Sequence, residues 1–202
     1  METKLIFGIL SSIVAIVCFI PYFRDIFLKK TQPHAYSWLI WTILQVVGVL
    51  AQLKDGGGYG AWALGVGAIS CFAIFLLSFK YGTKNISRFD FLCLLTSLVA
   101  IVFYLKLSNP VWSILVVTGI DFVGFLPTYR KGWKEPETET VSTYIMSASA
   151  NLLSLFALQN YTVTTVFYIA SLLFTNTLFS SIVLFKRHLV SEKNDKAINL
   201  NG

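Results

Sequence analysis

Residues 21–41, PYFRDIFLKKTQPHAYSWLIW, decide the fold: an apolar run ends near a proline, a short basic loop follows, and a second apolar run begins. Residues 127–147, PTYRKGWKEPETETVSTYIMS, repeat this plan 106 positions later without a gap. Pro21 then pairs with Pro127. Self-similarity at a fixed distance indicates a duplicated structural unit.

Composition predicts that the duplicated unit lies in a membrane. Hydrophobic residues make up 55% of the 202 residues, charged residues make up 13%, and the mean hydropathy is +0.69. A soluble globule would have too little polar surface to cover such a chain. The net charge of +6 comes from short loops between apolar runs, which is typical of orientation signals and not of a nucleic-acid surface. The three cysteines lie in apolar runs without metal-ligand spacing, so we expect no metal and no cofactor.

Seven apolar runs approach the length of about 20 residues that crosses a bilayer as a helix. The polar break at residues 159–162 divides the long uncharged stretch 140–185 into the last two runs. We therefore expect an all-α membrane protein with seven transmembrane helices. The first five runs cover residues 5–23, 36–53, 60–79, 89–106 and 110–129.

The repeat divides these spans into two three-helix bundles joined by a linker helix. We expect a first repeat at 1–83, a linker helix at 84–108, a second repeat at 109–187 and a disordered cytoplasmic tail at 188–202. One inserted helix makes the two bundles parallel. Thirteen of the sixteen lysines and arginines fall on one side of this topology. The excess of positive charge predicts that the N-terminus is outside and the C-terminus is cytoplasmic.

This organisation resembles the PQ-loop superfamily, which includes the SWEET and SemiSWEET sugar transporters and lysosomal transporters of cystine and cationic amino acids. The family's Pro-Gln pair reads Pro-Tyr at Pro21 and Pro-Thr at Pro127. The resemblance covers residues 5–187 and implies transport of a small polar solute, an amino acid or a sugar, by alternating access. It also implies that the two prolines are hinges. SWEET proteins bind sugar through asparagines on the third helix of each unit, which here points to Ser70 and Asn176.

Polar side chains inside the apolar runs mark a candidate solute site. Gln45 follows Trp41 by one helical turn, and the repeat places Asn151 at the position equivalent to Gln45. We expect these three side chains to line a central cavity together with Ser70 and Asn176. Helix packing is the alternative role for such residues, because small and amide side chains also join membrane helices.

Asp121 is the acid that lies deepest inside an apolar run, in VVTGIDFVGFLP. A charged carboxylate at a bilayer centre costs about 2.5–3.5 kcal/mol on insertion scales, so it should face the bundle interior. A proton-coupled carrier needs a group that alternately binds and releases a proton, and Asp121 is the candidate. Hydrogen bonding to Thr118 or to a neighbouring helix would give it a structural role instead.

Two other functions share this layout. Trp38, Trp41 and Gln45 form a WxxWxxxQ pattern that is similar to the WxxWxxxN/D signature of PnuC vitamin transporters. KDEL receptors have the same fold and bind a ligand without transporting it. Enzyme motifs are absent from the sequence, so we do not expect an enzyme. His34 and His188 are expected to be solvated.

The expected partners are a small polar solute, the lipid bilayer and protons, with a homo-oligomer as an open alternative and without nucleic acid. The short tail lacks an obvious lysosomal sorting signal. A bacterial inner membrane is therefore favoured over an endolysosomal one.

Overall fold

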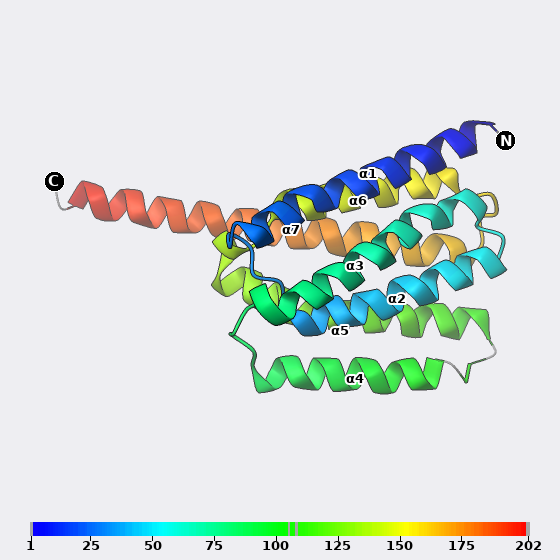
Figure 1. Ribbon diagram of the computed structural model, residues 1–202, viewed down its shortest axis with the longest axis horizontal. Helices are drawn as coiled ribbons and strands as arrows, with labels where there is room; N and C mark the ends of the chain where they lie inside the picture. The colour runs from blue at the N-terminus through cyan, green and yellow to red at the C-terminus, as the bar shows by residue number, and fades with distance from the viewer. Residues whose placement is uncertain (1, 105, 108, 201–202) are drawn as a thin grey trace.

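The computed structural model describes residues 2–104, 106–107 and 109–200. This part of the chain forms seven α-helices, two short 3-10 helices and no strand, which confirms the all-helical prediction. The helices alternate in direction along one long axis, so the two ends of the chain lie at opposite ends of the bundle (Figure 1). The helices are α1 (Glu2–Phe27), α2 (Ala35–Lys54), α3 (Trp62–Tyr81), α4 (Arg88–Tyr104), α5 (Pro110–Lys134), α6 (Val141–Ala157) and α7 (Val163–Leu200), with the 3-10 helices η1 (Gly58–Ala61) and η2 (Pro136–Thr138).

Within the described residues, five helical segments are long and apolar enough to cross a membrane, namely α1, α2, α3 extended by η1, α5 and α7. This number is consistent with an integral membrane protein. The other two helices, α4 and α6, have 17 residues each. At 1.5 Å per residue they are about 26 Å long, close to the lower limit for crossing a hydrocarbon core of about 30 Å.

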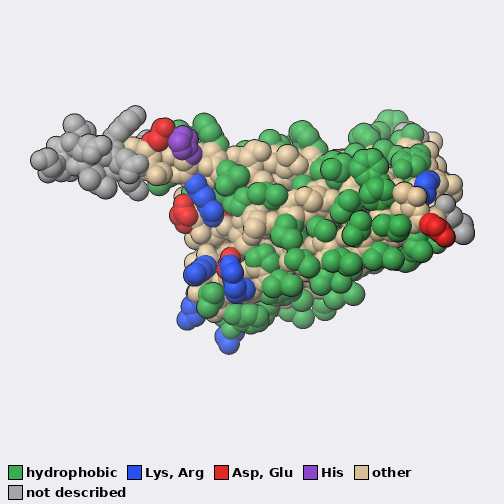
Figure 2. Space-filling view, turned by 90° about the horizontal axis from the view of Figure 1, so that it is seen from above, with side chains coloured by type: hydrophobic (Ala, Val, Ile, Leu, Met, Phe, Trp, Pro, Cys, Tyr) green, Lys and Arg blue, Asp and Glu red, His purple; other side chains and the backbone are tan. Residues whose placement is uncertain are grey.

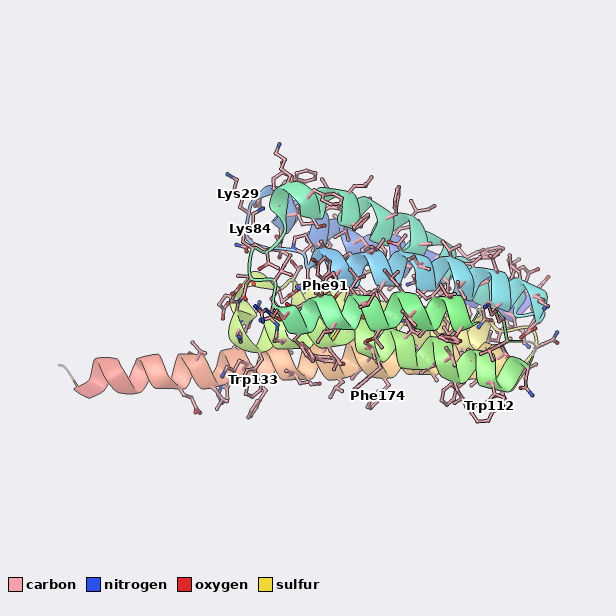
Figure 3. All side chains as sticks on the ribbon, turned by 90° about the horizontal axis from the view of Figure 1, so that it is seen from below. Lys29, Lys84, Phe91, Trp112, Trp133 and Phe174 are labelled. Atoms are coloured by element: carbon pink, nitrogen blue, oxygen red, sulfur yellow. The ribbon has the colours of Figure 1, made fainter. Side chains whose placement is uncertain are left out.

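The outer surface matches a lipid environment. Hydrophobic side chains are spread along the face of the bundle that Figure 2 shows, whereas lysine and arginine gather at the end from which α7 projects. Lys29, Lys84 and Trp133 lie at that end, and Trp112 lies at the other (Figure 3). Both tryptophans are exposed, as expected for side chains at the two membrane interfaces.

Two helices continue further than the sequence indicated. Both prolines lie inside a helix: α1 runs past Pro21 to Phe27, and α5 runs past Pro127 to Lys134. Proline removes one backbone donor but does not prevent helix on its C-terminal side. Buried side chains such as Ile26 anchor the added turns.

The segment that was expected to be a disordered tail continues helix α7 in the residues that the structure describes. Helix α7 continues to Leu200 and leaves the bundle as a single projecting helix (Figure 1). The segment contains neither proline nor glycine before Gly202, and His188 lies 3.2 Å from Glu192 one turn later. Such pairs favour a helix in polar sequence.

The helices pack in the same order in the two halves of the chain. Helix α3 lies between α1 and α2, and α7 lies between α5 and α6. Among the described residues, neither α1 and α2 nor α5 and α6 come into close backbone contact. The halves meet where α1 packs on α6 and α2 packs on α5. Helix α4 covers α5 and α2 from outside, at the edge of the bundle (Figure 1).

Candidate functional site

A cavity of about 60 Å³ lies at the centre of the bundle, between the two halves of the chain. One water needs roughly 10–15 Å³ by this measure, so the cavity has room for a few waters or a very small solute. Nearly all of its side chains are buried. Its lining consists of Phe19, Trp38, Trp41, Gln45, Cys71, Asp121, Phe125, Thr143, Tyr144, Ser147, Asn151, Tyr168, Leu172 and Asn176.

The duplication is visible in this lining. Four positions on α1 and α2 line the cavity, and so does the residue 106 positions after each of them on α5 and α6. The equivalent faces of the two halves therefore meet at the cavity. The four pairs are Phe19 with Phe125, Trp38 with Tyr144, Trp41 with Ser147, and Gln45 with Asn151.

Most of the predicted site residues lie together around this cavity. Five of the six that were assigned to solute binding or proton coupling are in its lining: Trp41, Gln45, Asp121, Asn151 and Asn176. The sixth, Ser70, is not. Its neighbour Cys71 faces the cavity instead, because α3 turns a different side of the helix towards the interior.

Asp121 is 1% exposed, and its Oδ2 atom has no hydrogen-bond partner among the described residues. The Thr118 hydroxyl likewise has no partner in that part of the chain. Thr118 therefore does not hold the carboxyl in place. Thr175 on the neighbouring helix α7 lies beside the carboxyl, as the other structural alternative expects, but a hydroxyl cannot neutralise its charge.

The other polar groups of the lining divide into two kinds. The amide nitrogens of Asn151 and Asn176 donate to carbonyl oxygens one turn earlier in their own helices, at 2.9 and 2.8 Å. Gln45 Oε1 and Trp41 Nε1, by contrast, are buried and lack a partner among the described residues. The cavity thus offers two unpartnered acceptors, Gln45 Oε1 and Asp121 Oδ2, and one unpartnered donor.

A layer of aromatic rings closes the cavity towards the basic end. The Tyr22 ring centre lies 5.0 Å from that of Trp38 and 6.4 Å from that of Tyr144. The Tyr144 ring in turn contacts Phe179 at 4.3 Å. On the side of this layer that faces the basic end, the Tyr144 hydroxyl lies 3.5 Å from the carboxylate of Glu139. A solute would have to displace these rings to reach the basic end.

At the opposite end, hydrogen bonds tie the two halves together. The Gln52 side-chain amide donates to the Thr165 carbonyl at 2.9 Å, and the Gln159 backbone amide donates to the Gly57 carbonyl at 3.3 Å. The cavity therefore lies between two contact layers, the aromatic rings at the basic end and these hydrogen bonds at the opposite end.

The two prolines lie next to equivalent contacts between the halves. Ser37 donates to the Gly124 carbonyl, three residues before Pro127, and Thr143 donates to the Cys18 carbonyl, three residues before Pro21. Both hydrogen bonds measure 2.8 Å. Each proline-containing turn is thus fixed by a hydroxyl from the other half of the chain.

Sequence reasoning missed a buried charge cluster at the basic end. His34, expected to be solvated, is 2% exposed. Its Nε2 lies 3.5 Å from the carboxylate of Asp90, which also accepts hydrogen bonds of 2.9 and 2.5 Å from Arg130. Burial lowers the pKa of His34, while Asp90 acts in the opposite direction. His188, by contrast, is exposed as expected.

No group of three or more metal-ligating side chains occurs within the described ranges. The chain matches no protein-family model, no curated protein and no solved structure.

Proposed function

We propose that the protein is a membrane transporter that moves a small polar metabolite, of the amino acid or sugar class, by alternating access. The observation that carries this proposal is the central cavity, lined by equivalent residues from the two halves of the chain. A carrier needs a binding site at the interface between two units that can move against each other. The cavity is lined from both halves of the chain, with a contact layer on either side.

In this proposal α1–α3 and α5–α7 are the two moving units and α4 is the linker. Two observations support the division: the helices have the same packing order in both halves, and the hydrogen bonds of Ser37 and Thr143 are equivalent. Pro21 and Pro127 are the proposed hinges, because each lies one turn from such a contact. Rotation of one unit against the other would open one contact layer and leave the other closed.

The end from which α7 projects is proposed to face the cytoplasm of a bacterial cell. Basic side chains gather at this end (Figure 2), and an excess of lysine and arginine marks the cytoplasmic side of membrane proteins. The N-terminus then lies outside.

The transport proposal is tested by counterflow. Purified protein in liposomes is preloaded with unlabelled alanine, glucose or uridine, and the uptake of the same labelled solute is followed. A carrier gives a transient accumulation above equilibrium. Binding that stops at one solute per protein, with no accumulation, would instead identify a receptor that does not transport, and absence of both would overturn the proposed site.

Proton coupling through Asp121 is tested in the same liposomes. Asp121→Asn keeps the size of the side chain and removes its ionisation. We expect the variant to lose the response of uptake to a pH gradient. An unchanged response would exclude Asp121 as the coupling group. Glu137→Gln, at a carboxylate whose side chain is 72% exposed, is the matched control.

A facilitator of vitamins or nucleosides is the second candidate. All three residues of the WxxWxxxQ pattern, Trp38, Trp41 and Gln45, line the cavity. Stacked aromatic rings suit a flat heterocycle. Preference for uridine in the counterflow panel, without response to a pH gradient, would favour this function.

A further inference from the structure

The electrostatic character of the cavity narrows the solute that it fits. Asp121 is the acid in the lining, and no lysine, arginine or histidine is among the lining residues. The nearest described cluster of buried basic groups, at Lys131 and His34, lies beyond the aromatic layer. When Asp121 is ionised, its charge has no counter-charge within the cavity.

The open hydrogen-bonding positions favour a solute that donates. Asp121 Oδ2 and Gln45 Oε1 are both buried acceptors without a partner among the described residues. A primary ammonium carries three donors and no acceptor. An ammonium in the cavity can donate to such oxygens, whereas a buried acceptor that stays unsatisfied is costly.

Aromatic rings form a large part of the remaining lining. The Trp41 ring centre lies 4.5 Å from that of Phe125 and 5.0 Å from that of Trp38. Tyr144 and Tyr168 complete this part of the lining. Aromatic faces attract cations, and the attraction is greater where water is excluded.

The same features oppose other solutes. A solute carboxylate would be desolvated without a cationic partner, which is strongly unfavourable. A neutral polyol would leave the charge of Asp121 unpaired. We propose that the cavity binds a small primary amine without a carboxylate, with its ammonium group between Asp121 and Gln45 and its carbon atoms against the aromatic rings.

This inference rests on the proposed function for its transport aspect. Among small polar metabolites, it selects amines in place of amino acids and sugars as the substrate class. One carboxylate can hold a proton or an ammonium but not both. Asp121 would therefore release its proton when the amine binds, and a pH gradient would drive amine in exchange for protons.

Four probes of similar size test the binding site. Ethanolamine is the cation, ethylene glycol the neutral analogue, glycine the zwitterion and glycolate the anion. Each is titrated at pH 7 into the protein in lipid nanodiscs, and the fluorescence of tryptophan is followed, because Trp38 and Trp41 line the cavity. We expect saturable binding of ethanolamine, at least tenfold tighter than binding of the other three. Equal or tighter binding of ethylene glycol, glycine or glycolate would overturn the proposal.

Two variants test whether ethanolamine binds in the cavity. Asp121→Asn should weaken ethanolamine binding at least tenfold, whereas Glu137→Gln should leave it unchanged. Equal affinity of Asp121→Asn and wild type would overturn the proposal. The comparison of probes on wild-type protein does not require that Asp121→Asn folds. A fluorescence change with pH alone, while no probe binds, would show a proton site only and would also overturn it.

Failure of this inference is distinguishable from failure of the transport proposal. Ethanolamine that binds but shows no counterflow would leave the amine site in place and overturn the carrier. Counterflow of alanine or glucose without ethanolamine binding would support the carrier and overturn the amine site.

Discussion

The ammonium of Lys131 lies 2.7 Å from the carboxylate of Glu139, and neither side chain is more than 2% exposed. Lys131 also donates to the Thr138 carbonyl at 3.0 Å. This buried ion pair joins the end of α5 to the start of α6, directly below the aromatic layer. It therefore fixes the wall of the cavity on the basic side.

Removing one partner of this pair should destabilise the protein strongly. Glu139→Gln leaves the Lys131 ammonium buried without its counter-charge, which typically costs about 3–5 kcal/mol. Thermal unfolding in detergent measures the loss. The double variant Lys131→Met with Glu139→Leu should recover much of it, because it removes both charges. Glu137→Gln, in the exposed pair with Arg187, should cost about 1 kcal/mol or less.

Acidification should destabilise the protein through His34. Burial lowers its pKa in the folded state, and the charges of Arg130 and Lys131 act in the same direction, against the effect of Asp90. The unfolded chain then binds a proton that the folded chain does not bind. Stability should be constant above about pH 7 and fall as the pH decreases below about 6.5, the usual pKa of histidine. The midpoint of thermal unfolding as a function of pH measures this.

The variant His34→Asn should show a smaller loss of stability on acidification than wild type. His188→Asn is the matched control, because that side chain is 69% exposed. A wild-type protein that becomes more stable between pH 7 and pH 5.5 would contradict the sign of this prediction.

Replacing each of two glycines on α5 with alanine should have different effects on the stability of the protein. A Cβ atom at Gly124 would lie 2.8 Å from Ile40 on α2, whereas one at Gly119 would meet nothing within 4 Å. Gly124→Ala should therefore cost about 1–3 kcal/mol by overpacking. Gly119→Ala should be neutral or stabilise by up to about 1 kcal/mol through helix propensity. Comparison of their unfolding temperatures tests the packing of α2 on α5.

The equivalent hydroxyl groups of Ser37 and Thr143 should contribute unequally to the stability of the protein. Ser37→Ala removes the hydrogen bond to Gly124 and also the acceptor of Thr128, whose hydroxyl lies 2.9 Å from Ser37. Thr143→Val removes the bond to the Cys18 carbonyl alone. Each lost bond costs about 0.5–1.5 kcal/mol, so Ser37→Ala should destabilise more. Equal losses in thermal unfolding would contradict this asymmetry.

Much of the architecture was predictable because duplication leaves a direct trace in sequence. The offset that pairs Gln45 with Asn151 also identified cavity positions, since equivalent residues occupy equivalent places in two similarly packed units. Asp121 could be predicted from the cost of an acid in lipid. Asn176 was suggested by a family resemblance.

Other features required three-dimensional information. Ser70 was chosen as the position equivalent to Asn176 in the first repeat, but the rotation of a helix about its axis depends on its neighbours and not on its own sequence. The burial of His34 depends on Asp90 and Arg130, which are distant in the chain. A polar loop with basic residues looks the same in sequence whether it is solvated or covered by another segment.

Helix α7 is continuous over 38 residues, from the wall of the cavity to a segment outside the bundle. Its length is about 57 Å at 1.5 Å per residue, and Asn176 lies in its N-terminal half. A tilt of the cavity wall by a few degrees therefore becomes a displacement of several ångströms at the C-terminus. A fluorophore attached there would report such a tilt at a distance from the cavity.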